Sequence, residues 1–170
     1  MEFNEVIRRR YSCRAFDGRP VEAEKTDTIL EAARLAPTAK NLQPFRIYMA
    51  RSEEVLARID TIHRSRYGAP LVFVVTALKS EAYTYWGGEY DSSVEDATIV
   101  ATHMMLAAEN EGLGTCWINA FDPGFAGSEL GLPDGEHVVM MLAVGYRAPG
   151  ACPAPKHFER RNLEDTVKEL

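Results

Sequence analysis

The sequence is short of several features by which large classes of protein are recognised. Its three cysteines, Cys13, Cys116 and Cys152, are odd in number and lack the spacing of a metal site, so neither a zinc centre nor a disulfide framework is expected. The longest apolar run, at about residues 70–78, is too short to cross a bilayer. The N-terminus also lacks the apolar stretch of a secretion signal. These absences predict a cytoplasmic protein without a membrane partner.

Positive charge is scarce over the chain as a whole. Its 19 basic and 25 acidic residues give a net charge of −6 at pH 7. Proteins that bind nucleic acids without sequence preference instead contact the phosphate backbone through clustered positive charge. We therefore expect no nucleic-acid partner. The length of 170 residues, with 46% hydrophobic and 26% charged residues, fits one globular domain over residues 1–170.

Two catalytic signatures are missing as well. No Gly-x-Gly-x-x-Gly follows a strand-like segment, which argues against a Rossmann dinucleotide site. The four histidines are scattered without a matching nucleophile and orienting acid, so a hydrolytic triad has no support.

The apolar pattern predicts helices and strands in no regular alternation, which favours an α+β fold over a doubly wound one. The first short helix is expected to turn positions 3, 6 and 7 inward. Further helices are expected at 22–35, after Ser52, at 93–110 and as a stub from 163, and a small helix or turn is expected at 123–130. Strands are expected at 46–50, 71–77, 115–118 and 137–145. The helix over 93–110 is apolar almost all round, as in helices buried in a core or between subunits. Residues 79–92 show neither period and are predicted to be an aromatic, glycine-bearing loop.

A cationic cluster with a hydroxyl stands near the N-terminus, at residues 8–14 (Arg-Arg-Arg-Tyr-Ser-Cys-Arg). Guanidinium groups match phosphate oxygens in bidentate fashion and stay charged at any working pH. Within an acidic protein, so local a cluster favours a small anionic ligand over a polyanion. The alternative is a solvated basic face at the end of the first helix, where cations complement the helix dipole.

An amide-rich turn follows about thirty residues later, at residues 36–44 (Ala-Pro-Thr-Ala-Lys-Asn-Leu-Gln-Pro). The side chains of Asn41 and Gln43 offer both donors and acceptors, which suits a heterocycle with alternating C=O and N–H groups. The alternative is a helix-terminating turn in which Asn41 bonds only its own backbone. That alternative leaves Gln43-Pro44-Phe45 unexplained, so ligand contact is favoured.

In this order the two clusters resemble the FMN-dependent nitroreductase family, whose members carry Arg-Arg-x-Ser-x-Arg and then Ala-Pro-Ser-x-x-Asn-x-Gln-Pro-aromatic. Further matches along the chain are Ala69-Pro70 before a strand, the segment 112–118, Val144-Gly145-Tyr146 and the segment 160–164. The resemblance covers nearly the whole chain, with residues 79–95 the least typical. It implies a nitroreductase-like fold with a mixed central β-sheet flanked by helices. It also implies an intertwined homodimer with FMN in each of two interface clefts.

The resemblance also implies the site residues. Arg10, Ser12 and Arg14, with Tyr11 between them, match the turn that contacts phosphate. Arg160 matches an arginine that returns to the same phosphate, and Lys156 and Arg161 compete for that role. The residues expected to pack on the flavin from the partner subunit are Pro37, Thr38, Ala39, Asn41 and Gln43. The residues expected beneath the ring, where a backbone N–H faces the flavin N5, are Trp117, Ile118, Asn119 and Ala120; the first two also fit a strand core.

The function implied by the resemblance is an FMN-dependent oxidoreductase. NADH or NADPH would supply a hydride, and a nitroaromatic, quinone or similar electron-poor acceptor would be reduced. The alternatives are a relative with different chemistry, such as reductive dehalogenation or flavin cleavage, and a non-enzymatic FMN-binding sensor or carrier. No catalytic acid or base is assigned, since the redox chemistry is the flavin's. The aromatic residues between positions 83 and 90 are candidates for a substrate-shaping lid, or ordinary surface residues.

Overall fold

The computed structural model describes residues 1–170 and is organised around a four-stranded sheet in the order β1-β2-β4-β3. The strands are β1 (Phe45–Ala50), β2 (Leu71–Leu78), β3 (Gly114–Ile118) and β4 (Glu136–Gly145). The helices are α1 (Phe3–Arg9), α2 (Ala23–Arg34), α3 (Glu53–Ile62), α4 (Ser93–Asn110), α5 (Pro123–Leu130) and α6 (Leu163–Thr166). These positions confirm the elements that the apolar pattern predicted.

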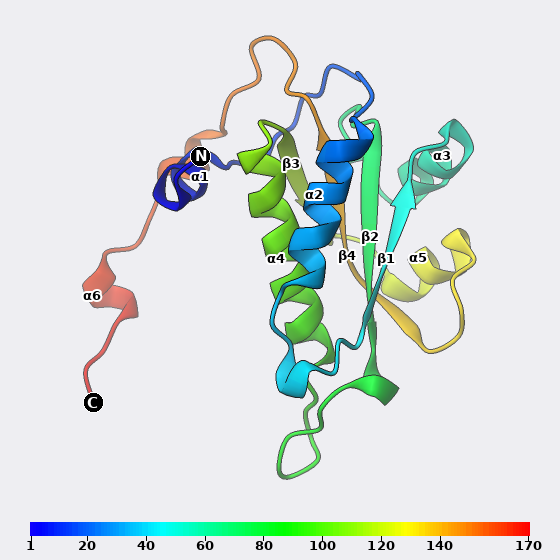
Figure 1. The fold of residues 1–170 in the computed structure, drawn as a ribbon, viewed down its shortest axis with the longest axis vertical. Coiled ribbons are helices and arrows are strands. Elements are labelled where there is room, and N and C mark those ends of the chain that lie inside the picture. The colour runs from blue at the N-terminus through cyan, green and yellow to red at the C-terminus, as the bar shows by residue number, and fades with distance from the viewer.

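Helices cover both faces of the sheet, α2 and α4 on one face and α3 and α5 on the other (Figure 1). Alternate residues of a strand point to opposite faces. Phe73 and Val75 of β2 accordingly pack in the core with α2 and α4, while Val72 and Val74 pack in the core with α3 and α5. The continuous apolar run in β2 is therefore explained by burial on both faces.

The sheet departs in one respect from the mixed sheet that the resemblance implied. All three ladders between its strands are antiparallel. Parallel pairing is limited to an isolated bridge between Ser12 and Thr115. That bridge lays the segment after α1 alongside the edge strand β3.

Two helices are less buried than their sequences predict. In α1 only Val6 is buried, whereas Phe3 is 66% and Ile7 44% exposed. This helix has only seven residues and lies beside α4, away from the sheet, so it has one neighbour to cover it (Figure 1). In α4 one face is buried, but Val94 and Ile99 are exposed. None of the helices combines the length and apolar character needed to span a membrane.

Candidate functional site

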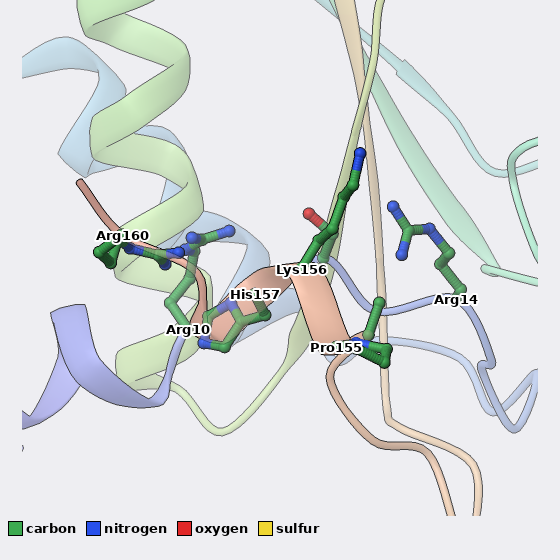
Figure 2. A pocket seen from close by; sticks show the side chains of 8 residues that line it. Arg10, Arg14, Pro155, Lys156, His157 and Arg160 are labelled. Carbon is green, nitrogen blue, oxygen red and sulfur yellow. The ribbon is translucent and has the colours of Figure 1, made fainter.

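A cationic pocket of about 540 Å³ lies where the two ends of the chain meet. Its lining residues are Arg10, Ser12, Arg14, Ala154, Pro155, Lys156, His157 and Arg160. In Figure 2, Arg10 and Arg160 lie on one side, and Lys156 and Arg14 on the other. Four cationic side chains and one hydroxyl line the pocket without a carboxylate, a donor set that suits an anion such as phosphate. We call it the cationic pocket below.

The N-terminal wall of the pocket is set by strand-like pairing with β3. The Cys13 backbone N–H donates to the carbonyl of Thr115 at 2.7 Å, and the Cys13 side chain is fully buried. Because side chains alternate along an extended segment, Ser12 and Arg14 face the other way, toward the pocket. A Cβ on Gly114 would lie 3.0 Å from both Cys13 Cβ and Arg147 Cγ, so a larger residue there would press against both side chains.

The C-terminal wall is a strap held against the N-terminal segment. Its first contact is the Ala148 N–H, which donates to the carbonyl of Ala15 at 3.0 Å. The Tyr11 hydroxyl donates to the carbonyl of Ala151 at 3.1 Å. A short 3-10 helix, η3 (Pro155–Phe158), then delivers Lys156 and His157 to the pocket. Tyr11 is thus buried behind the wall and positions the strap, and it is not among the lining residues.

Of the three basic residues expected to compete at the C-terminal end, two reach the pocket. Lys156 and Arg160 line it and Arg161 does not. Arg10 is half-buried, whereas Arg14, Lys156 and Arg160 are exposed. The charge of Arg10 is therefore the least screened of the four.

A buried ion pair behind the pocket was not foreseen from the sequence. The Glu109 carboxylate, 1% exposed, accepts a hydrogen bond from Arg147 Nη2, and Arg9 Nε lies 3.9 Å from its other oxygen. The guanidinium of Arg147 in turn lies 5.1 Å from the Tyr11 ring centroid. Burial is the largest cause that raises the pKa of the Tyr11 phenol above its ordinary 10.0, and the nearby Cys13 thiol is the next. Tyr11 therefore stays a neutral donor to the strap at neutral pH.

The thiols near the pocket are unreactive by the same reasoning. Burial raises the pKa of Cys13 and of Cys116 above the ordinary 9.0, which lowers the fraction of reactive thiolate at neutral pH. Cys152, by contrast, is exposed. In native protein at pH 7.5, we therefore expect iodoacetamide to label Cys152 alone on a timescale of minutes, as read by peptide mass spectrometry. Denatured protein should label at all three positions, and rapid native labelling of Cys13 or Cys116 would contradict this assignment.

The second predicted cluster forms a strained turn over residues 38–43 around the 3-10 helix η1 (Ala39–Asn41). Lys40, Asn41 and Gln43 have φ values of 51°, 57° and 55°, in the left-handed region that costs a non-glycine residue roughly 1–2 kcal/mol each. The Gln43 N–H donates to the Thr38 hydroxyl at 3.1 Å, and the Gln43 side-chain amide donates to the Asn41 carbonyl at 3.0 Å. We call residues 38–43 the amide turn.

The amide turn is not an Asx-type turn. The exposed Asn41 side chain makes no hydrogen bond to the chain's own backbone, while the Ala39 N–H donates to a carboxylate oxygen of Asp96 at 2.8 Å. Such strain persists where the surrounding structure holds it, and it concentrates at functional sites. This geometry supports the ligand-contact interpretation of Asn41 over the alternative.

The chain segments that line the cationic pocket lie at one end of α4, and the amide turn lies at the other (Figure 1). The turn is bonded to Asp96 in the first helical turn of α4, whereas Ser12 pairs with Thr115, beyond its last residue Asn110. An α-helix of 18 residues is about 27 Å long. The two clusters of one chain therefore do not line a common pocket.

The third predicted segment lies at the end of β3. Trp117 packs against the core of α2 and α4, and Ile118 belongs to the core of α3 and α5, which confirms that both are strand residues. Asn119 and Ala120 are exposed just beyond the strand. Since a strand rises about 3.3 Å per residue, Asn119 lies about 13 Å along the edge from Thr115. No group of three or more histidine, cysteine or acidic residues is arranged to hold a metal ion.

Comparisons with known proteins agree with this architecture. The sequence profile of the Nitroreductase family matches residues 7–67 and 64–146. The crystal structure of a nitroreductase family protein from Clostridium difficile 630 has a TM-score of 0.91 and 33% identity, covering 99% of this chain and 98% of that one. An FMN-dependent nitroreductase from Clostridium difficile R20291 has a TM-score of 0.72 and 27% identity, covering 92% and 97%.

A sequence relative from an archaeon is similar over most of both chains. This Methanothermobacter thermautotrophicus protein, provisionally named an NADH dehydrogenase/NAD(P)H nitroreductase, is 30% identical over 159 residues, which are 87% of this chain and 78% of that protein. The solved structures confirm the α+β, nitroreductase-like fold. Because the family profile spans most of its residues, the chain belongs to the nitroreductase family.

Proposed function

We propose that residues 1–170 form one FMN-binding domain of an oxidoreductase that uses NADH or NADPH to reduce electron-poor acceptors such as nitroaromatics and quinones. The observation that carries the proposal is the cationic pocket, in which residues from both ends of the chain meet at the positions of the family's phosphate motif. The names of the relatives, one FMN-dependent and one NAD(P)H-linked, support it.

The cationic pocket fits the phosphate end of FMN. A phosphate monoester carries between one and two negative charges at neutral pH, and four cationic side chains and the Ser12 hydroxyl face the pocket. The half-buried Arg10 is the principal anchor. Glu109 is engaged by Arg147 and Arg9, so its negative charge is compensated behind the pocket wall.

The ring end of FMN would be completed by a second copy of the chain. Within one chain the amide turn stands about a helix length from the pocket, so the turn that meets the isoalloxazine belongs to the partner. Exposed apolar side chains, which favour such an association, lie on α1, on α4 and just after α2, at Phe3, Leu35, Val94 and Ile99. The terminal arm, which extends away from the sheet (Figure 1), exposes Leu163 and Val167. We therefore propose a homodimer with two shared sites.

The chemistry that FMN supplies when bound is hydride acceptance from NADH or NADPH and electron delivery to the acceptor. The protein anchors the phosphate through Arg10, Ser12 and the strap, and presents amide donors and acceptors from the amide turn. The backbone beyond β3, at Asn119 and Ala120, would place N–H dipoles where negative charge develops on the ring. No side-chain acid or base is required.

The visible spectrum of the purified protein tests this proposal. Protein supplied with FMN should be yellow, should bleach when NADH or NADPH is added without oxygen, and should regain its colour when a nitroaromatic or quinone is added. A flavin that does not bleach would favour a sensor or carrier, and loss of the flavin itself would favour flavin cleavage. Recovery of colour with a halogenated phenol alone would favour dehalogenation. Protein that stays colourless at saturating FMN refutes all of these functions.

A further inference from the structure

Asp96 is a buried carboxylate that has one oxygen engaged by the amide turn and the other by Ser92, the N-cap residue of α4. Its side chain lies in the first turn of α4 and the residue is 2% exposed. One oxygen accepts the N–H of Ala39 at 2.8 Å, and the other accepts the hydroxyl of Ser92 at 2.7 Å. An acidic residue that merely complemented the helix dipole would work equally well in solvent. Burial of this charge instead indicates that its two partners must be held in place.

The Ser92 side of this link leads into an aromatic hairpin over residues 83–92. The Ser92 hydroxyl accepts the N–H of Tyr83 at 3.2 Å, and the Ser92 N–H donates to the carbonyl of Tyr83 at 2.9 Å. Thr84 then pairs with Asp91 as an antiparallel bridge. At the tip Trp86 is 97% exposed, and Tyr90 behind it is 73% exposed. The segment predicted to be a loop is therefore an ordered hairpin whose base is tied to Asp96.

The Ala39 side of the link leads into the amide turn. Two of the turn's hydrogen bonds, at Thr38 and Asn41, are internal and do not connect it to the rest of the protein. Where the chain enters β1, the Phe45 N–H donates to the Gln43 carbonyl at 2.8 Å. The polar contacts that connect the turn to segments distant in sequence are the Asp96 bond and the Lys40 ammonium, which lies 4.2 Å from the Tyr83 ring centroid. Both of these contacts lead to the hairpin or to the carboxylate at its base. Turn and hairpin are thus one unit with Asp96 at its centre.

We propose that Asp96 is a positioning residue that keeps the amide turn and the aromatic hairpin in register. The inference rests on the proposed function, in which the turn meets the flavin ring. The hairpin then stands beside the ring, where its aromatic side chains face the electron acceptor. Planar, electron-poor aromatic acceptors are the class that such side chains would stack against. Asp96 therefore couples cofactor binding at the ring to acceptor binding, and has no part in phosphate binding.

Titration of both FMN and riboflavin, which lacks the phosphate, separates the two ends of the site. In Asp96→Ala both acceptor oxygens are removed, so the Ala39 N–H and the Ser92 hydroxyl each lose their partner. We expect the affinity for both flavins to fall by the same factor, about tenfold, leaving the FMN-to-riboflavin ratio unchanged. The control Glu54→Gln alters an exposed acidic residue in the first turn of α3 and should leave both affinities as in wild type.

Two further variants act on one side of the link at a time, so that the test survives if Asp96→Ala does not fold. Ala39→Pro replaces the N–H that Asp96 accepts with a ring methylene. Thr38, at φ −135° and ψ 158°, already has the extended backbone that precedes proline. Ala39→Pro should weaken the binding of both flavins as Asp96→Ala does. Ser92→Ala should leave flavin affinity within about twofold, yet raise the KM for a nitroaromatic acceptor and speed proteolysis between residues 83 and 91.

The outcomes distinguish this inference from the function on which it rests. If wild-type protein binds no flavin, the proposed function fails. If wild type binds flavin and Ala39→Pro binds both flavins as tightly, the positioning role of Asp96 is wrong while the function stands. A loss confined to FMN, with riboflavin unaffected, would likewise overturn it, because the defect would then lie at the phosphate. If Ser92→Ala keeps the wild-type KM and the wild-type rate of proteolysis, the inference that the hairpin forms one unit with the turn is wrong.

Discussion

Arg10→Ala is expected to weaken FMN binding by about 1.5–3 kcal/mol, the range for a hydrogen bond to a charged group, or roughly 10- to 150-fold in Kd. Arg10 is the half-buried member of the cationic pocket, so solvent and salt screen its charge less than those of its three exposed neighbours. Riboflavin affinity should not change, because riboflavin has no phosphate. Quenching of flavin fluorescence during titration measures both affinities.

Arg8→Ala is the matched control for this experiment. Arg8 lies in the last turn of α1, two residues before Arg10, and is exposed. It does not line the pocket, yet its removal changes the net charge by the same amount. Its effect on FMN binding should stay within about twofold, as for an exposed charge. Arg160→Ala should fall between the two, since Arg160 lines the pocket but is exposed. FMN retention in Arg10→Ala equal to wild type would place the phosphate elsewhere.

Two variants that each fail to hold FMN should restore binding when they are combined in one dimer. The first variant, Arg10→Ala with Arg160→Ala, lacks two of the four cations of the pocket. The second, Asn41→Pro, disrupts the amide turn, because proline is locked near φ −65° while Asn41 has φ 57° and donates its N–H to Thr38. In a mixed dimer one site carries both lesions and the other carries none.

Random exchange of subunits should therefore recover about a quarter of the wild-type flavin sites, as expected for a two-fold symmetric pair. Co-refolded mixtures, freed of unbound flavin, give the bound fraction from visible absorbance. The control is each variant refolded alone, which should stay nearly colourless. Absence of recovery in a mixture that does form mixed dimers would mean that one chain supplies both ends of its site, contrary to the separation along α4.

Most of the secondary structure was predictable because it follows from local patterns. The β-branched run at 71–77 predicted a strand buried on both faces, and Val72 and Phe73 do pack in opposite cores. Ser52 was predicted to begin a helix, and its hydroxyl accepts the N–H of Val55. Part of the candidate site could also be predicted from the sequence, since the three motif residues Arg10, Ser12 and Arg14 line one pocket.

The sequence alone therefore determines which segments form helices or strands and which residues can bind an anion. Their partners depend on contacts between residues far apart in sequence, which leave no local period to read. The choice of Arg160 over Arg161, the pairing of Glu109 with Arg147, and the burial of Asp96 between Ala39 and Ser92 are of this kind. The distance between the pocket and the amide turn is likewise decided by the tertiary structure. The two motifs are only about thirty residues apart in the sequence, but the length of the rigid helix α4 separates them in space.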